Sequence, residues 1–398
     1  MLARLPEAFM RMALTGGLAI LFLLALAVQP ACSQSEDAPE RQLDTLFSRL
    51  VRPTDPGCAV LVKYGGLKVL EKGYGVRALR TQSKIDQRTN FRLASATKQF
   101  TAMAIMLLIH DGKLHYDDRL TDVFPGFPAY GKSITIRNLL THTSGLPDYE
   151  ELMDDEEKVK GPIWSENHQI QDAEVLTLLE HATTGKFAPG TSWAYGNSAY
   201  VVLGLIIAKA SGLPYRDFLQ QRIFAPAGMD HTIVYQKGIN QVTDRAFGHS
   251  KEDDKFTETD QSSTSATLGD GAIYSNLEDM SKWHEALEKH SLLSEKEMAP
   301  ALVPVKLADG SEPHWPNSPG EDDPNAGKPV SYGFGWFLSP WEGRPRMWHT
   351  GETRGFRNVI NRFTANGLTV VILCNREDLT PEALAEKSAG IVLQTGTH

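Results

Sequence analysis

Residues 95–110, SATKQFTAMAIMLLIH, mark the point at which the chain changes from strand signals to helix signals. The long apolar run in this stretch predicts a buried helix, and the residues that follow it continue the helical pattern. Before it, residues 58–64 and 67–74 predict two strands joined by Gly65-Gly66, a pair that suits a tight hairpin turn. The sequence therefore begins a sheet early and then interrupts it.

Strand signals return in the last part of the chain. The further elements that the patterns predict are strands at residues 332–338, 346–349, 356–363 and 368–374, with helices at residues 41–51 and 381–393. Strands at both ends of the chain imply one antiparallel sheet with helices packed on its faces. We expect an α+β fold, in which residues 41–94 and 265–398 form a sandwich subdomain and residues 95–264 an inserted all-helical subdomain with a polar loop.

Composition excludes some classes of protein. A chain of 398 residues with 41% apolar residues is ordinary for a globular protein, and its net charge of -9, with no concentrated basic stretch, argues against nucleic-acid binding. Three cysteines are too few for a disulfide framework and match no metal-site spacing. Cys58 and Cys374 fall in predicted strands, and the sequence leaves open whether they pair or stay buried thiols. The acidic residues 150–157 are interpreted as a solvated loop.

The N-terminus has the pattern of a targeting signal. Arg4 and Arg11 are followed by an apolar core over residues 13–28, which is short for a membrane span and suits a signal peptide. We interpret residues 1–33 as a signal peptide or a lipoprotein signal, with Cys32 as the acceptor in the second case. The expected location is periplasmic or extracellular, with membrane contact only through a signal anchor or a lipid.

Ser95 and Lys98 form the first candidate catalytic pair. A spacing of three residues at a helix start places Lys98 one turn beyond Ser95 on the same face. A serine hydroxyl is a weak nucleophile until a base takes its proton, and an amine within reach can do so. The N-terminus of the helix adds backbone donors where an oxyanion would form. The same tetrad also occurs by chance in ordinary helices.

Tyr195-Gly196-Asn197 supplies the next candidates, in a loop that precedes a predicted helix. A phenol near an ammonium can accept the serine proton and return it to the leaving group. The Asn197 amide can bind Lys98 and a substrate carbonyl. Tyr274-Ser275-Asn276 has the same spacing, but we favour Tyr195 because Ser275 is better explained as the cap of a helix.

The third candidate set is His349-Thr350-Gly351, at the end of a predicted strand. His349 and Thr350 can hydrogen-bond a substrate, and Gly351 would allow the substrate to lie against the strand backbone. The alternative is a strand end with a turn glycine.

In this order the three motifs resemble those of class C β-lactamases and related D-alanyl-D-alanine carboxypeptidases. The similarity extends to FRLA before Ser95, to LLTHTSGL at residues 139–146 and to GAIYS at residues 271–275, and it covers most of the chain. The resemblance implies the β-lactamase/transpeptidase-like fold. It also implies an oxyanion hole made by the backbone N–H groups of Ser95 and Glu352.

His349 departs from the lysine that class C β-lactamases usually carry. Histidine is only partly charged near neutrality, so the expected grip on a substrate carboxylate is weaker, and we consider Arg354 as a replacement charge. We expect a serine hydrolase that acts through an acyl-enzyme on a small molecule or peptide, including cell-wall fragments, with esterase or D-amino-acid peptidase or carboxypeptidase activity favoured. The alternatives are a class C-like β-lactamase and a non-catalytic penicillin-binding sensor or scaffold. No metal or organic cofactor is implied.

Overall fold

A computed structural model describes residues 38–316 and 325–395, so the expected targeting signal lies outside the described residues. A five-stranded antiparallel sheet forms the centre of this part, in the order β10-β11-β12-β1-β2. Its strands are β1 (Cys58–Tyr64), β2 (Leu67–Tyr74), β10 (Arg346–Thr353), β11 (Phe356–Phe363) and β12 (Leu368–Cys374). The early hairpin and the late strands thus complete one sheet, as the sequence predicts.

The central pair β1 and β12 explains why the two ends of the chain meet. Both segments are nearly continuous apolar runs, which suits strands that are buried on both faces. Cys58 lies opposite Cys374 in the register, and the two are joined by a disulfide, which decides the question that the sequence left open. At the other side of β1, Gly65 and Gly66 both take positive φ, as the two-residue hairpin turn requires.

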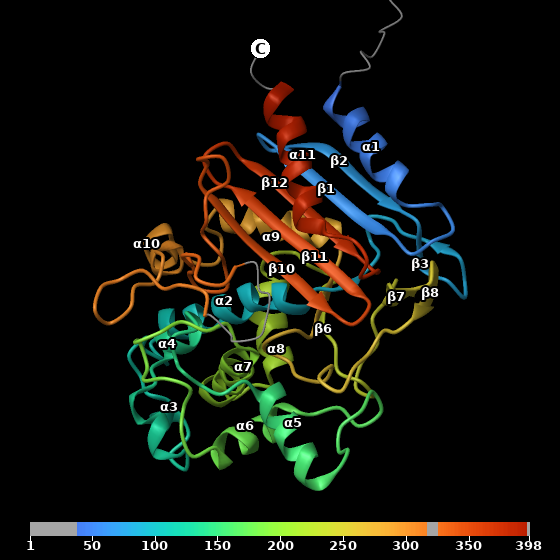
Figure 1. The fold of residues 1–398 in the computed structure, drawn as a ribbon. Helices are drawn as coiled ribbons and strands as arrows, with labels where there is room; N and C mark the ends of the chain where they lie inside the picture. The colour runs from blue at the N-terminus through green and yellow to red at the C-terminus, as the bar shows by residue number, and fades with distance from the viewer. Residues whose placement is uncertain (1–37, 317–324, 396–398) are drawn as a thin grey trace, which may run out of the picture. The chain divides into compact units, whose positions relative to one another are not determined.

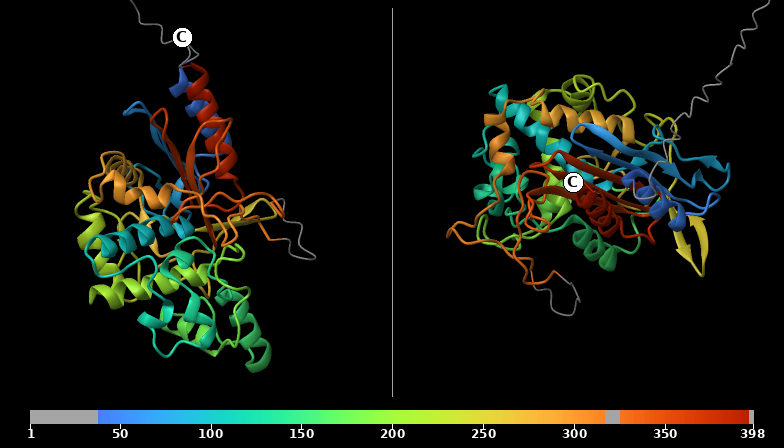
Figure 2. Two further views of the ribbon diagram at one scale, coloured as in Figure 1. Left: turned by 90° about the vertical axis from the view of Figure 1, so that its left-hand side faces the viewer. Right: turned by 90° about the horizontal axis from the view of Figure 1, so that it is seen from above.

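Helices cover both faces of the sheet. The helices α1 (Pro39–Leu50) and α11 (Pro381–Thr395) contact each other and lie together on one face, as the two ends of the colour range show in Figures 1 and 2. On the other face, α9 (Leu277–Glu288) packs on β1 and β12, in the same core as α2 (Lys98–His110). The result is a sandwich with one apolar core on each side of the sheet.

Further helices lie beyond α2, in the lower half of Figure 1. They are α3 (Leu120–Val123), α4 (Ile136–Leu140), α5 (Tyr149–Lys160), α6 (Asp172–His181), α7 (Asn197–Ser211) and α8 (Tyr215–Leu219), with α10 (Glu295–Met298) near the edge of the sheet. Single turns are η1 (Ala94–Thr97), η2 (Ala129–Ser133), η3 (Gln220–Phe224) and η4 (Ala299–Leu302). The α+β fold with an antiparallel sheet and flanking helices is confirmed.

Short strands add detail within and around the helical segment. They are β3 (Val76–Ala78), β4 (Ser83–Lys84), β5 (Phe91–Arg92), β6 (Ile233–Val234), β7 (His249–Glu252), β8 (Lys255–Glu258) and β9 (Ile273–Ser275). Residues 95–264 are therefore not entirely helical, because β6 pairs with β9 and the polar loop contains the hairpin β7–β8. The residues that the structure describes form one compact unit, and the subdomain boundaries stay predictions.

Three local predictions were wrong. Residues 332–338 form no regular strand; Tyr332 and Phe337 face each other in a tight turn, and Phe337 bridges to Trp348 of β10. The acidic residues after Asp148 form helix α5, because the Asp148 side chain accepts the N–H of Glu150 and so caps it. Helix α9 is capped by Asn276, whose side chain accepts the Asp279 N–H, and not by Ser275.

Within the described ranges, no single helix has the length and apolar composition needed to cross a membrane, although α7 and the segment after it meet that test as a pair bent by 77°.

Candidate active site

Ser95 lies on the turn η1, directly before α2. The preceding Ala94 has a φ of 49°, a left-handed conformation that is uncommon for a residue with a side chain and occurs often at functional turns. Ser95 is half-buried, whereas the Lys98 side chain behind it is completely buried. The turn thus presents the hydroxyl at the surface of a cavity and keeps the amine inside.

The Lys98 ammonium has three acceptors. Its Nζ donates to Ser95 Oγ at 3.1 Å, to Asn197 Oδ1 at 2.8 Å and to the Asp270 carbonyl at 3.3 Å. An ammonium has three protons, so its hydrogen-bonding capacity is filled. Lys98 is therefore held in one position against the candidate nucleophile, as the spacing in the sequence predicts.

Asn197 begins helix α7 and is fixed from three sides. Its N–H donates to Asp148 Oδ2 at 3.0 Å, and its Nδ2 donates to Glu150 Oε1 at 3.3 Å, which leaves Oδ1 for Lys98. The expected contact between Asn197 and Lys98 is present. Asn197 also links Lys98 to Glu150, a residue for which the sequence gave no role.

Tyr195 lies beside Lys98, with its ring centre 5.0 Å from Nζ. Its hydroxyl is buried and has no hydrogen-bond partner in the described part of the chain. The proton-transfer role of Tyr195 stays a prediction, because no bond joins it to Ser95 or Lys98. The rival Tyr274 is completely buried and its hydroxyl accepts from Arg245 at 3.0 Å, outside the Ser95 cavity.

His349 is placed behind the cavity and not at its surface. Its Nδ1 donates to the Thr350 carbonyl at 2.6 Å, and its Nε2 lies 3.2 Å from the Tyr332 hydroxyl, which can donate to it. Burial, and then the charge of Lys98, lower the pKa of His349 to about 3, so the ring is neutral at neutral pH. The sequence predicts that His349 binds a substrate carboxylate only weakly. In the structure its ring has no charge with which to bind one at neutral pH.

The remaining residues of β10 divide between two faces. A side chain at Gly351 would meet the Leu93 carbonyl at 1.9 Å, so this glycine lets β10 pack against the residues before the nucleophile turn. Thr350 lines another cavity, near the start of α11, whereas Glu352 lines both that cavity and the Ser95 cavity. Arg354 is exposed and is not among the residues around Ser95. The binding roles of Thr350 and Gly351 stay predictions.

The cavity at Ser95 has a volume of about 50 Å³ and is rich in carboxyl groups. The side chains that line it, besides Ser95 and Asn197, include Arg92, Tyr149, Glu150, Thr267, Asp270 and Glu352. Asp270 is 6% exposed, and burial raises the pKa of its carboxyl. The pKa of Glu150 is also raised, by partial loss of water and then by Asp148 and Asp270.

Several of these residues were missed by the sequence analysis. Arg92 stood in a family-like segment and Glu150 in an acidic run, and neither pattern says that the side chain faces Ser95. Arg92 is 3% exposed, with Nε on the Gly271 carbonyl, Nη2 on the Ser265 carbonyl and Nη1 without a partner in the described residues. Its donors are largely occupied by the backbone, so most of the open charge around Ser95 is negative.

Comparison with known sequences finds a matching family model and related proteins. A family model described as Beta-lactamase matches residues 43–393. Penicillin-binding protein 4* of Bacillus subtilis is 33% identical over 358 residues, which are 85% of this chain and 72% of that protein. A D-aminopeptidase of Cereibacter sphaeroides is 29% identical over 86% of this chain, which spans only 60% of that protein's length.

Solved structures show the same fold. The D-amino acid amidase from Ochrobactrum anthropi has a TM-score of 0.72 at 23% identity and covers 91% of this chain and 99% of its own. A penicillin binding protein from Bacillus halodurans has a TM-score of 0.69 at 26% identity, with 88% of this chain and 98% of its own covered. The expected β-lactamase/transpeptidase-like architecture is confirmed.

Proposed function

Because this chain belongs to the Beta-lactamase family and is a serine hydrolase, we propose that it cleaves small amides, peptides or esters whose acyl part carries a free ammonium group. D-amino acid derivatives are the proposed substrates, since a D-aminopeptidase and a D-amino acid amidase are among the similar proteins. The observation that carries the proposal is the set of carboxyl groups around Ser95.

The proposed reaction has two steps. Lys98 first gives one ammonium proton to solvent; Ser95 Oγ then attacks the carbonyl carbon while its proton passes to the neutral amine of Lys98, the titratable group within hydrogen-bond distance, with Tyr195 as the second proton carrier. The amine or alcohol leaves with that proton and an ester on Ser95 remains. Water then attacks this ester, releases the acid and returns a proton to Ser95. The N–H groups of Ser95 and Glu352 are the proposed oxyanion donors.

The charges near Ser95 favour a cationic substrate over an anionic one. Glu150 is exposed beside the cavity, and the hydrogen bond recorded for its carboxylate comes from the neutral amide of Asn197. Glu352 is partly neutralised by Arg357, whose Nε lies 3.3 Å from Oε2. His349, which would hold a substrate carboxylate if it were a lysine, is neutral. Glu150 is therefore the proposed partner of the substrate ammonium.

A matched set of substrates tests this proposal. D-alanine p-nitroanilide is compared with its N-acetyl derivative, its L isomer and a chromogenic cephalosporin, with Ser95→Ala as the background. We expect the free amine to have the highest kcat/KM, by about tenfold or more over the acetylated compound, because only the former can pair with Glu150. Equal or faster cleavage of the acetylated compound or the cephalosporin would contradict the proposal.

Two glutamate variants locate the effect. Glu150→Gln is expected to lower kcat/KM for the free amine by about 10- to 100-fold and to leave the acetylated compound nearly unchanged. Glu151→Gln is the matched control, because Glu151 follows Glu150 on α5 and its exposed carboxylate pairs with Lys186. If Glu150→Gln and Glu151→Gln change kcat/KM for the free amine equally, Glu150 does not bind the substrate ammonium.

The disulfide between Cys58 and Cys374 supports the further proposal that the protein works outside the cytoplasm, since such bonds persist in oxidising compartments. The mass of the mature chain isolated from its host, with or without a lipid on Cys32, tests this location.

A further inference from the structure

A second cavity lies between the sheet and helix α9, and it shares no lining residue with the cavity at Ser95. Its volume is about 370 Å³, within the range of small-ligand sites. Met347, Arg362 and Thr369 enter it from β10, β11 and β12, while His284 and Leu287 enter from α9. The rest of the apolar wall includes Met298, Leu302, Phe363 and Leu368.

His284 is a buried histidine with nothing to bind. It is 3% exposed, and neither Nδ1 nor Nε2 has a hydrogen-bond partner among residues 38–316 and 325–395. Burial, and then the charges of Arg362 and Lys63, hold the pKa of His284 well below its usual range. The neutral ring therefore offers one N–H donor and one acceptor at the wall of the cavity. Buried polar groups are nearly always paired, so this one calls for a ligand or water.

Arg362 is a cation without a carboxylate in contact. The hydrogen-bond contact that its guanidinium makes is with Met347 Sδ at 3.8 Å, and a thioether is a weak acceptor. Burial lowers the pKa of Arg362 to about 10, against the opposing effect of Glu288, so the group stays charged at neutral pH. No ion pair of Arg362 is found in the described part of the chain. The Arg362 side chain is half-buried, so a carboxylate that enters the cavity would pair with a charge that has no ion pair in the described residues.

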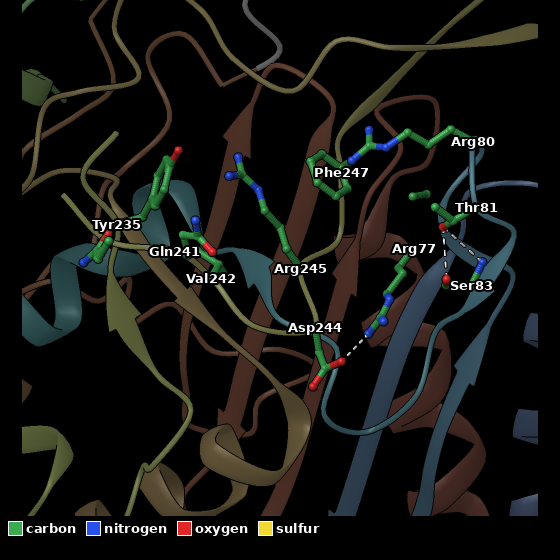
Figure 3. A pocket seen from close by; sticks show the side chains of 12 residues that line it. Arg77, Arg80, Thr81, Ser83, Tyr235, Gln241, Val242, Asp244, Arg245 and Phe247 are labelled. Atoms are coloured by element: carbon green, nitrogen blue, oxygen red, sulfur yellow. Dashed lines mark hydrogen bonds and ion pairs between the residues drawn. The ribbon is translucent and has the colours of Figure 1, made fainter. Parts of the chain in front are cut away.

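A different pocket is lined by three arginines that are all paired with acids (Figure 3). It has a similar volume of about 390 Å³, and Arg77, Arg80 and Arg245 line it. Each of these has its own acid: Arg77 donates to Asp244 at 2.7 Å, as the dashed line shows, Arg80 pairs with Glu258 and Arg245 with Asp260. Each arginine of that pocket thus has an acidic partner, whereas Arg362 in the cavity under α9 has no ion pair in the described residues.

The other charged groups near α9 limit what can enter. Lys63 is already bound to Glu285 at 2.8 Å and to Ser281 at 3.0 Å, so it is not free for a ligand. Glu288 and Glu295 are exposed and line the cavity, where they would repel a ligand with several negative charges. The cavity thus offers the Arg362 guanidinium, the buried His284, the exposed His290 and apolar walls.

We propose that this cavity binds a small monocarboxylate with an apolar body. The carboxylate would accept from the guanidinium of Arg362, whose planar donors fit two oxygens, and from the N–H of His284. The apolar body would lie against Leu287, Met298 and Leu302. Neither Ser95 nor any group around it takes part, so the site is separate from the acyl-transfer reaction.

Calorimetric titration of the full chain with sodium 3-phenylpropanoate tests the proposal. We expect saturable binding of the carboxylate and binding of 3-phenylpropanamide that is about 10- to 100-fold weaker, because the amide lacks the charge. Arg362→Met is expected to remove the preference for the carboxylate. Arg344→Met is the matched control, since Arg344 is more exposed and pairs with Glu342 outside the cavity.

Further variants keep the test decisive if Arg362→Met is poorly folded. Arg362→Lys keeps the charge but loses the planar donor pair, so it should bind the carboxylate more weakly than the parent and more tightly than the amide. His284→Leu should weaken the carboxylate several-fold and leave the amide almost unaffected. Absence of binding at millimolar carboxylate, equal binding of acid and amide, or unchanged binding in Arg362→Lys and His284→Leu would each overturn the proposal.

Discussion

Lys98 is a completely buried cation and Arg362 a half-buried one, and the chain surrounds them differently. Lys98 has three acceptors supplied by the chain and lies beside a cavity of about 50 Å³. Arg362 contacts a thioether and lies beside a cavity of about 370 Å³. Each has a buried neutral histidine nearby, His349 in the first case and His284 in the second. A cation beside a neutral buried histidine thus occurs once with three hydrogen-bond acceptors from the chain, at Lys98, and once without an ion pair in the described residues, at Arg362.

The difference shows what each charge is for. A cation that the protein fully satisfies is held at one distance from a reacting group, which is what proton transfer requires. A cation left without acceptors keeps its binding capacity for a group from outside. Burial and charge alone do not separate a catalytic lysine from a ligand-binding arginine; the hydrogen-bond partners do.

The largest expected effect comes from Lys98→Met, which removes the satisfied cation. We expect kcat/KM for a short p-nitrophenyl ester, and the rate of labelling by a fluorophosphonate, to fall by about 10³-fold, because Ser95 loses its proton acceptor. Stopped-flow assays at neutral pH measure both rates.

Lys63→Met is the control for Lys98→Met. Lys63 is also buried, but it pairs with Glu285 on α9 and does not contact Ser95. It should keep most of the activity. If the Lys98→Met enzyme is as fast as the Lys63→Met enzyme, a residue other than Lys98 takes the proton of Ser95.

The next effect concerns the histidine beside Lys98. The pKa of His349 is about 3 in the folded protein and about 6.5 in an unfolded chain, so between these values the unfolded chain binds the extra proton. The free energy of unfolding must therefore fall as the pH drops below 6.5, by about 1.4 kcal/mol per pH unit from this residue. His349→Gln should lose about 2 kcal/mol less than the parent between pH 6.5 and pH 5.

Urea unfolding at the two pH values measures this difference. His231→Gln, at an exposed histidine, serves for comparison and should follow the parent. If His349→Gln loses as much stability as the parent, the ring is not held neutral by its surroundings.

The smallest effect is expected for the unsatisfied cation. Without ligand, Arg362→Met should change the free energy of unfolding by about 1 kcal/mol or less, because it removes a half-buried charge that has no ion pair in the described structure. Urea unfolding at neutral pH measures it. A loss above about 3 kcal/mol would mean that the folded chain itself satisfies Arg362, as it satisfies Lys98.

The sequence predicted the part of the site that depends on local spacing. Ser95 and Lys98 are one helical turn apart, and the main strands are recognisable from their apolar runs, so both could be inferred without any long-range contact. The choice of Tyr195 over Tyr274 agrees with the geometry, but its stated reason was wrong, because Asn276 and not Ser275 caps α9.

What the sequence could not predict depends on long-range packing. Asp270 directly precedes the family-like GAIYS segment and Glu150 stands in an acidic run, but both come to Ser95 only through the contacts of β9 and α5 with distant parts of the chain. The sequence assigned Gly351 to substrate access, which stays a prediction, and could not show that its missing side chain also makes room for the Leu93 carbonyl. His284 and Arg362, from α9 and β11, meet only because the sheet brings its last strands under that helix.

The order of the strands along the chain also determines when the site can form during synthesis. Ser95 and Lys98 leave the ribosome early, but β10, which packs on Leu93, and β12, which fills the middle of the sheet, are among the last segments to be made. A nascent chain therefore carries its nucleophile long before it has the strand against which that nucleophile is held. Covalent labelling of Ser95 would therefore detect chains in which the complete sheet has formed, and not chains that still lack β10 and β12.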